Sequence, residues 1–241
     1  MKVGILIPCY QGRRPLLERT LDLLTRQTWK GDLSIWIIDD GSDEHLDEAC
    51  HFGLHYLKLR DAGAAPRSSN MAYRAGYEAC DADFIILTHP EYLVPEASVE
   101  TLVQRYDGVH RIGHSPIAIP RKVQRYLDQW NWRDPDSLMD IPGIVTENSP
   151  WGWTNAYGKE WCHHLVFSGQ DRAGWDRLGF LPATEERGYN DSWLLPLEIE
   201  HGFPPVCSGL SGYHQWHERL FQDGKPVGLV KRSVRVGRLD P

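Results

Sequence analysis

The chain up to about residue 105 alternates between short apolar runs and segments in which apolar residues recur with helical spacing. The apolar runs predict strands at residues 3–7, 33–38, 54–59 and 84–87. The helical spacing predicts helices between them, at residues 15–28 and 66–80. Strands that are apolar along most of their length and alternate with helices are typical of a parallel sheet covered by helices on both faces.

Aromatic loops become frequent after about residue 106, and eight of the ten tryptophans lie between Trp130 and Trp216. Trp151 and Trp153 flank a glycine in a segment with no strand or helix pattern. Tryptophan beside small and polar residues suits stacking on sugar faces, so we expect the cluster to line a groove. For any single tryptophan, a place in the core is an equally good interpretation.

We expect one domain, because no linker or internal repeat interrupts the sequence. Residues 1–105 would form one half, and residues 106–222 an aromatic-rich half built onto the same sheet. Residues 223–241 would form a basic tail, with five basic residues and no acid between Lys225 and Arg238. Such a tail suits contact with phosphate, anionic lipid or DNA, and equally suits a solvated segment.

The composition excludes several classes of protein. The 241 residues are 41% hydrophobic and 11% aromatic, which disfavours a disordered chain or a coiled coil. The net charge of −7 disfavours a dedicated nucleic-acid binder. No apolar run approaches the roughly 18 residues of a membrane span, and the first run stops too early for a signal peptide. The five cysteines form no C-x-x-C pair, so we expect buried thiols in a cytoplasmic protein, with peripheral membrane association left open.

Candidate chemistry lies where the predicted strands end. Polar residues follow three of them, at residues 8–10, 39–42 and 88–91. In an open parallel sheet, ligands bind beyond the carboxyl ends of the strands. The sequence contains neither a G-x-G-x-x-G loop nor a P-loop, so we expect recognition by carboxylates and a metal rather than by a glycine-rich phosphate cradle.

Several motifs together resemble the family 2 glycosyltransferases of the GT-A fold. They are VGILIPCY at residues 3–10, IIDDGS at 37–42, PRSSN at 66–70, GYNDSWL at 188–194 and HQWH at 214–217. The likeness covers most of the chain except residues 106–160. It implies a Rossmann-like, mostly parallel GT-A sheet with a donor half and an acceptor half. It also implies a nucleotide-sugar donor, expected to be a UDP-sugar, and transfer to an acceptor hydroxyl with inversion.

The resemblance assigns donor-binding roles to five residues. Asp39 matches the acid that accepts a hydrogen bond from the base, and a buried carboxylate needs such a donor. Pro8 and Tyr10 match positions that hold the base. Arg67 would neutralise the diphosphate through its planar guanidinium, and Asn70 would lie nearby. The alternatives are a turn-forming role for Asp39 and a surface position for Arg67.

The predicted metal site departs from the family pattern. The family's Asp-x-Asp corresponds here to Thr88-His89-Pro90-Glu91, which leaves Glu91 as the oxygen ligand for Mn²⁺ or Mg²⁺. His89 could add a nitrogen ligand. His214 and His217 are further candidates, because related enzymes donate a histidine from this region, and of the two we favour His217. Two half-buried surface histidines are the alternative.

The resemblance also points to a catalytic base. Asp191 opens a predicted helix at residues 191–202 and matches the second acid of the family's acidic pair, whose first position is Asn190 here. An inverting transferase needs one carboxylate to deprotonate the acceptor hydroxyl. A helix N-cap is the alternative role for Asp191. Asn190, Trp151 and Trp153 are the acceptor-side candidates.

Two other functions stay open. A sugar nucleotidyltransferase would show a glycine-rich basic loop after the first strand, and residues 11–15 echo one only faintly. A non-catalytic binder of nucleotides or carbohydrates is suggested by the missing Asp-x-Asp. The acceptor is not specified: a glycan, a lipid-linked sugar, a protein or a modified nucleic acid would each supply a hydroxyl.

Overall fold

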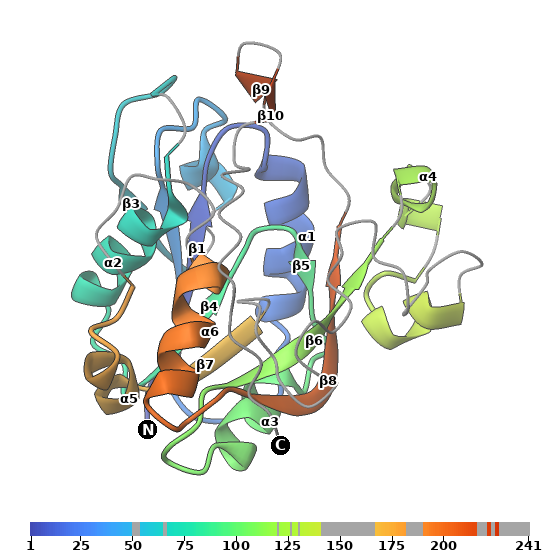
Figure 1. Ribbon diagram of the computed structural model, residues 1–241. Helices are drawn as coiled ribbons and strands as arrows, with labels where there is room; N and C mark the ends of the chain where they lie inside the picture. The colour runs from blue at the N-terminus through green and yellow to red at the C-terminus, as the bar shows by residue number, and fades with distance from the viewer. Residues whose placement is uncertain are drawn as a thin grey trace.

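The computed structural model describes residues 1–49, 54–64, 67–119, 121–125, 127–129, 131–140, 167–181, 190–215, 221–222 and 225–226. These residues form an α/β unit around a curled eight-stranded sheet (Figure 1). The strands are β1 (Val3–Cys9), β2 (Leu33–Asp39), β3 (Leu54–Lys58), β4 (Phe84–Thr88), β5 (Tyr92–Leu93), β6 (Ile112–Ala118), β7 (Phe167–Asp171) and β8 (Val206–His214). A separate ribbon pairs β9 (Phe221–Gln222) with β10 (Lys225–Pro226).

The strand order in the sheet is β3-β2-β1-β4-β7-β6-β8-β5. The four strands predicted from the apolar runs, β1 to β4, pair in parallel, which confirms the expected parallel core. β7 is antiparallel to both β4 and β6, and β6 is parallel to β8. The second half of the chain therefore extends the same sheet, as expected.

Helices cover both faces of the sheet because side chains of β1 alternate between them. Val3, Ile5 and Ile7 pack with α1 (Arg14–Leu24) and α3 (Ser98–Arg105). Leu6 points to the other face, toward α2 (Ser69–Ala79), α5 (Arg172–Arg177) and α6 (Asn190–Glu200). α2 approaches closely at Gly76, where a Cβ atom would lie 2.8 Å from Cδ1 of Ile38.

A third apolar cluster lies beside β6 and β8. It includes residues from α4 (Arg121–Gln124) and from the short 3₁₀ turns η2 (Leu127–Gln129) and η3 (Pro135–Asp140). Trp132 belongs to this cluster, and Trp175 of α5 is fully buried and donates its Nε1–H to the carbonyl oxygen of Ile85 at 3.0 Å. For these two tryptophans the core interpretation is therefore the right one. Trp151 and Trp153 lie outside the described residues.

The helix boundaries differ slightly from the prediction for local reasons. α2 begins at Ser69 because Ser68 is extended and its Oγ accepts the backbone N–H of Asn70 at 3.3 Å. α1 ends at Leu24, where Thr25 and Gln27 side chains donate to the last helical carbonyls. A further short 3₁₀ helix, η1 (Leu46–Ala49), follows β2.

Three of the cysteines lie in the described residues, and all are free thiols. Cys9 and Cys80 are buried as expected, whereas Cys207 is only half-buried. Within the described part of the chain, no helix has the length and apolar character that crossing a bilayer requires.

Candidate functional site

The carboxyl ends of six strands meet at one edge of the sheet. β1, β2, β3 and β4 run in parallel, and the two antiparallel steps through β7 return β6 and β8 to the same direction. Asp39, Thr88 and His214, the last residues of β2, β4 and β8, therefore lie along this edge. It is the edge at which open α/β sheets bind ligands.

Asp39 lies at this edge with 1% of its surface exposed. Its Oδ1 accepts the backbone N–H groups of Gly41 at 3.1 Å and Ser42 at 2.7 Å, and its Oδ2 accepts the Tyr56 hydroxyl at 2.6 Å. Gly41 has φ of +100°, which a side chain would strain. Asp39 thus organises the turn after β2. A carboxylate has about four acceptor positions, so one remains for an N–H donor from a base.

Asp40 is held between two arginines. Arg60 donates from Nε to Oδ1 at 2.7 Å and from Nη2 to Oδ2 at 2.9 Å, and Arg67 Nε lies 3.0–3.1 Å from both oxygens. Two guanidinium groups thus lie beside one carboxylate at the sheet edge. Arg67 therefore has an ion-pair partner in the protein rather than a plain surface position. Sequence reasoning missed Arg60, although its place two residues after the end of β3 was a signal.

Tyr10 is paired with Arg13 rather than standing alone after β1. Arg13 Nη2 donates to the Tyr10 hydroxyl at 3.0 Å, and the guanidinium carbon lies 4.8 Å from the Tyr10 ring centroid. Arg13 is 4% exposed. Burial opposes its charge, but the negative charge of Glu91 together with Tyr10 more than offsets burial and raises the pKa of Arg13. Pro8, the other predicted base-holding residue, is buried in β1 opposite Ile38.

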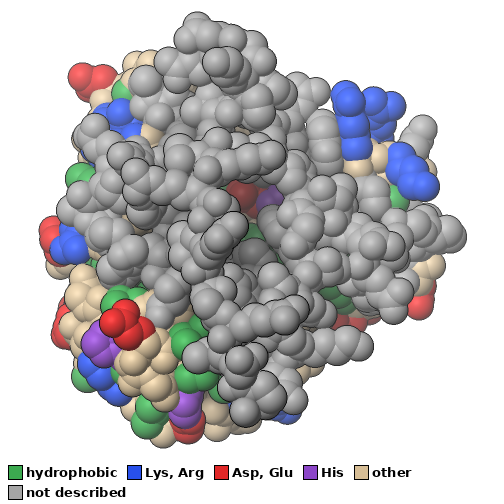
Figure 2. All heavy atoms as spheres, in the orientation of Figure 1, with side chains coloured by type: hydrophobic (Ala, Val, Ile, Leu, Met, Phe, Trp, Pro, Cys, Tyr) green, Lys and Arg blue, Asp and Glu red, His purple; other side chains and the backbone are tan. Residues whose placement is uncertain are grey.

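The structure brings Glu91 and His214 together. Glu91 is 6% exposed and its Oε1 lies 3.7 Å from Nε2 of His214. The contact results from strand pairing, because Tyr92 lies opposite His214 and the N–H of Gln215 donates to the Glu91 carbonyl at 2.8 Å. Thr20 of α1 fixes the turn by donating to the carbonyl of Tyr92 at 3.1 Å. An acidic and a histidine side chain are visible side by side near the centre of the face in Figure 2.

The other two predicted histidine ligands are not part of this pair. His89 is half-buried and packs near two aromatic rings, 5.8 Å from Tyr73 and 6.1 Å from Tyr92 between ring centroids. His217 lies outside the described residues.

Glu91 and His214 fit a divalent cation as two of its ligands. A carboxylate oxygen and an imidazole nitrogen 3.7 Å apart can both reach one ion at ordinary ligand distances of about 2.0–2.2 Å. The described residues contain no group of three or more His, Cys, Asp or Glu side chains placed to hold a metal. Mn²⁺ and Mg²⁺ often complete their shells with phosphate oxygens of a nucleotide, so a two-ligand site suits a metal that arrives with its substrate.

Asn70 occupies the first turn of α2 and is fully buried. Neither its Oδ1 nor its Nδ2 has a hydrogen-bond partner among the residues that the structure describes. A buried amide normally has partners, so this one marks a position where a polar ligand group would be favourable. Its helical spacing places it on the face of Tyr73 and Tyr77, which pack against the sheet.

The predicted catalytic residue begins α6. Asn190 and Asp191 are the first two residues of this helix, one residue earlier than predicted. Their side chains lie outside the described residues, so the roles of Asp191 as base and Asn190 in acceptor binding stay predictions. Leu194 and Leu195 of the next turn are buried and fix the helix against the sheet.

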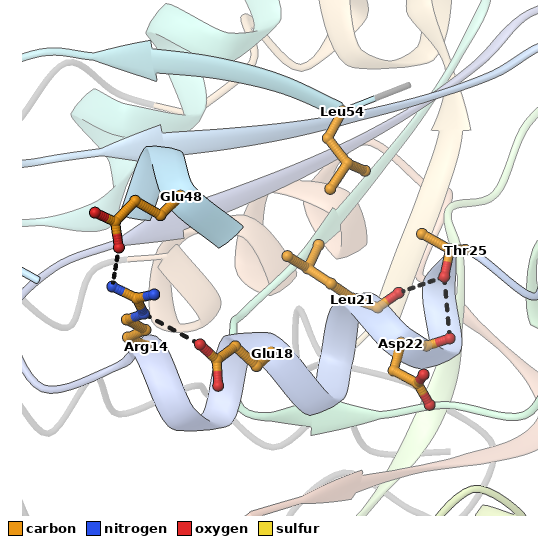
Figure 3. A pocket seen from close by; sticks show the side chains of 7 residues that line it. All are labelled: Arg14, Glu18, Leu21, Asp22, Thr25, Glu48 and Leu54. Atoms are coloured by element: carbon orange, nitrogen blue, oxygen red, sulfur yellow. Dashed lines mark hydrogen bonds and ion pairs between the residues drawn. The ribbon is translucent and has the colours of Figure 1, made fainter. Parts of the chain in front are cut away.

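A cavity of about 420 Å³ lies where α1 faces η1 and the start of β3 (Figure 3). It is lined by Arg14, Glu18, Leu21, Asp22, Thr25, Glu48 and Leu54. Its charges are satisfied internally, since Arg14 pairs with Glu18 at 3.1 Å and with Glu48 at 3.0 Å. We assign it no ligand.

Comparison with known proteins agrees with this geometry. The sequence profile described as Glycosyl transferase family 2 matches residues 4–141, which include β1 to β6 and the carboxylates at the sheet edge. The chain belongs to this family. A search of the curated proteins found no match.

Solved structures share the GT-A-type fold of this glycosyltransferase family member. The mannosyltransferase PcManGT from Pyrobaculum calidifontis, in complex with GDP-Man and Mn²⁺, is 15% identical with a TM-score of 0.58, over 90% of this chain and 58% of that one. S. aureus TarS is 10% identical with a TM-score of 0.57, over 90% and 37%. TarS residues 1–349 give 11% identity and 0.57, over 89% and 60%. This chain thus spans about two fifths to three fifths of these proteins.

Proposed function

We propose that this protein transfers a sugar from a nucleotide-diphosphate sugar to an acceptor hydroxyl, with inversion at the anomeric carbon. One observation carries the proposal: Asp39, Glu91 and the Asp40 carboxylate with its two arginines lie at the same edge of the sheet. The chain that carries them belongs to glycosyltransferase family 2. Binding such a donor requires a carboxylate that can accept a hydrogen bond from the base. It also requires positively charged side chains, such as arginine, that can bind the diphosphate.

The donor would lie across the ends of β1, β2 and β4. Asp39 would accept an N–H of the base with its remaining acceptor position, beside Pro8 and Tyr10. Arg67 and Arg60, which both bind Asp40 at this edge, would attract the diphosphate through their positive charge. Uracil and guanine both present a ring N–H, so this arrangement supports a UDP-sugar as expected and also admits GDP-Man, the ligand in the PcManGT structure.

A divalent metal would be held by Glu91 and His214, with His217 as a further candidate, and Mn²⁺ is the cation present in the PcManGT structure. When bound, such an ion neutralises the charge that develops on the leaving diphosphate. The positive charge of Arg13 interacts electrostatically with the carboxylate of Glu91 and would complement it at this site.

Asp191 would act as the general base, taking the proton of the acceptor hydroxyl as its oxygen attacks the anomeric carbon. The bond between that carbon and the diphosphate breaks on the opposite side, which inverts the configuration. Asn190, Trp151 and Trp153 would contact the acceptor.

A nucleotide-sugar panel tests the proposal. Purified protein is incubated with UDP- and GDP-sugars, with Mn²⁺, with Mg²⁺ and with EDTA, and release of the nucleoside diphosphate is measured beside nucleotide binding by calorimetry. Slow donor hydrolysis that is absent in Asp191→Asn is the expected result. Tight binding without turnover would favour the non-catalytic alternative, and release of pyrophosphate from a sugar phosphate and nucleoside triphosphate would favour a nucleotidyltransferase.

A further inference from the structure

A fully buried ion pair anchors the helix that begins with Asp191. Arg111, directly before β6, donates from Nε to Oε1 of Glu198 at 2.6 Å and from Nη2 to Oε2 at 3.0 Å. Its Nη1 donates to the Ser168 hydroxyl of β7 at 2.9 Å. Neither charged side chain has any exposed surface. One guanidinium thus ties together β6, β7 and α6.

An ion pair in this position is poorly explained by stability alone. Removing two charges from water is costly, and well-packed apolar residues of similar volume hold such elements together equally well or better. The pair also restricts orientation, because the two parallel hydrogen bonds of a bidentate guanidinium–carboxylate contact hold the two groups in a defined relative geometry. The contact at Glu198 therefore restricts the orientation of α6 relative to the sheet, in addition to holding the helix against it.

A proline inside α6 makes an additional anchor useful for this helix. Pro196 lies in the interior of α6 and has no N–H to donate to the preceding turn, which weakens the helix in its middle. Asp191 lies before Pro196 in the helix, and Glu198 lies after it. The other end of the anchor is close to the donor side, since Ser168 pairs with Leu87 of β4 and its neighbour Phe167 pairs with Thr88.

We propose that Arg111 and Glu198 are positioning residues, which hold α6 and therefore Asp191 at a set place relative to the end of β4. This inference rests on the proposed function for its catalytic consequence. The anchoring itself is a property of the fold that can be measured without turnover. Arg111 precedes β6 and Glu198 lies in α6, whereas the predicted donor-binding residues belong to the ends of β1 and β2 and the start of α2, so donor binding is not expected to depend on the pair.

The test uses the full chain with the double substitution Arg111→Met and Glu198→Met, which removes both charges and keeps apolar volume. We expect amide hydrogen exchange in residues 191–200 to speed up by about tenfold or more, while exchange in α2 stays unchanged. UDP and GDP affinity should change by less than about threefold. The kcat should fall by about 10- to 100-fold at a nearly constant KM for the donor, as expected when a reacting group is misplaced.

Two further variants complete the design. Lys2→Met with Asp81→Asn removes an exposed ion pair at the opposite edge of the sheet and should change none of these quantities. Ser168→Ala removes the hydroxyl that accepts from Nη1 of Arg111 and leaves the ion pair in place, so it keeps the proposal testable if the double variant does not fold. It should shift exchange in α6 and kcat in the same direction by a smaller amount.

Unchanged exchange in α6, or a wild-type kcat in a folded double variant, would overturn the inference. If the wild type transfers and hydrolyses no donor, the proposed function fails, while the exchange result still decides whether the pair anchors α6.

Discussion

The Nε2 atom of His214 lies 3.7 Å from the Oε1 atom of Glu91, although the two residues are more than half the chain apart. The turn after β4 carries Glu91, and the last residue of β8 is His214. The antiparallel pair of β5 with β8 places them side by side. This contact brings together two candidate metal ligands that lie far apart in the sequence.

We expect Glu91→Gln and His214→Asn each to raise the Mn²⁺ concentration needed for half-maximal donor turnover by at least about tenfold. Each substitution removes one of two protein ligands, and smaller changes around metal sites already cost about 10- to 100-fold in affinity. The measurement is a Mn²⁺ titration of donor hydrolysis at saturating donor. His89→Asn is the matched comparison, since His89 packs against aromatic rings instead. Full turnover in EDTA by the wild type would refute the metal site.

Asp39→Asn should weaken nucleotide binding by about 10- to 100-fold, the range for a hydrogen bond to a charged group. Asparagine keeps an oxygen that can accept the N–H groups of Gly41 and Ser42, so the turn should stay folded. A loss of nucleotide affinity would then result from removing the negative charge of Asp39. Calorimetry with UDP and GDP gives the affinities. Tyr56→Phe is the control, because it removes only the hydroxyl that donates to Asp39. Equal affinity in Asp39→Asn and the wild type would remove Asp39 from the site.

Asp191→Asn should reduce transfer by about 10²- to 10⁴-fold, the usual contribution of a positioned general base. Asp191 is the second residue of α6 and asparagine has almost the same size as aspartate, so the melting temperature should stay close to that of the wild type. Donor affinity should also persist, because the predicted donor residues lie at the ends of other elements. A folded variant that transfers sugar at the wild-type rate would point to another base or to a retaining mechanism.

His114 should make the fold sensitive to mild acid. It is fully buried, its Nδ1 lies 2.7 Å from the Ser208 hydroxyl, and burial lowers the pKa of His114 to about 3. Between this value and the ordinary pKa of about 6.5, the unfolded chain binds a proton that the folded chain does not. The free energy of unfolding contributed by neutral His114 is therefore fully present above pH 6.5 and declines as the pH falls toward 3.

Melting temperatures between pH 7 and pH 4 test this prediction. Because carboxylates also titrate in this range, the informative quantity is the difference between the wild type and His114→Gln, which keeps a polar partner for Ser208. The variant should lose less stability on acidification. Parallel curves for the two proteins would show that His114 does not contribute to the acid sensitivity.

The sequence by itself determined the parallel core of the fold and the carboxylates on it. Short apolar runs such as residues 3–7, which Pro8 closes, are typical of buried strands, so β1 to β4 could be predicted from local sequence. The turn after β2 was equally local, since Asp39 and Gly41 form it with their own neighbours. These features depend on interactions over a few residues, which the order of residue types records.

Only the tertiary structure decided which distant groups meet. β6 and β7 lack a strong local pattern and become strands through their neighbours in the sheet, which is why the individual strands of the second half were not predicted. The pairing of Arg67 with Asp40 and of Arg111 with Glu198 likewise follows from strand order. Each of these side chains has several possible partners in the sequence. The partner that each side chain binds is decided by the folded arrangement. In that arrangement the apolar clusters are packed and the buried charges are paired.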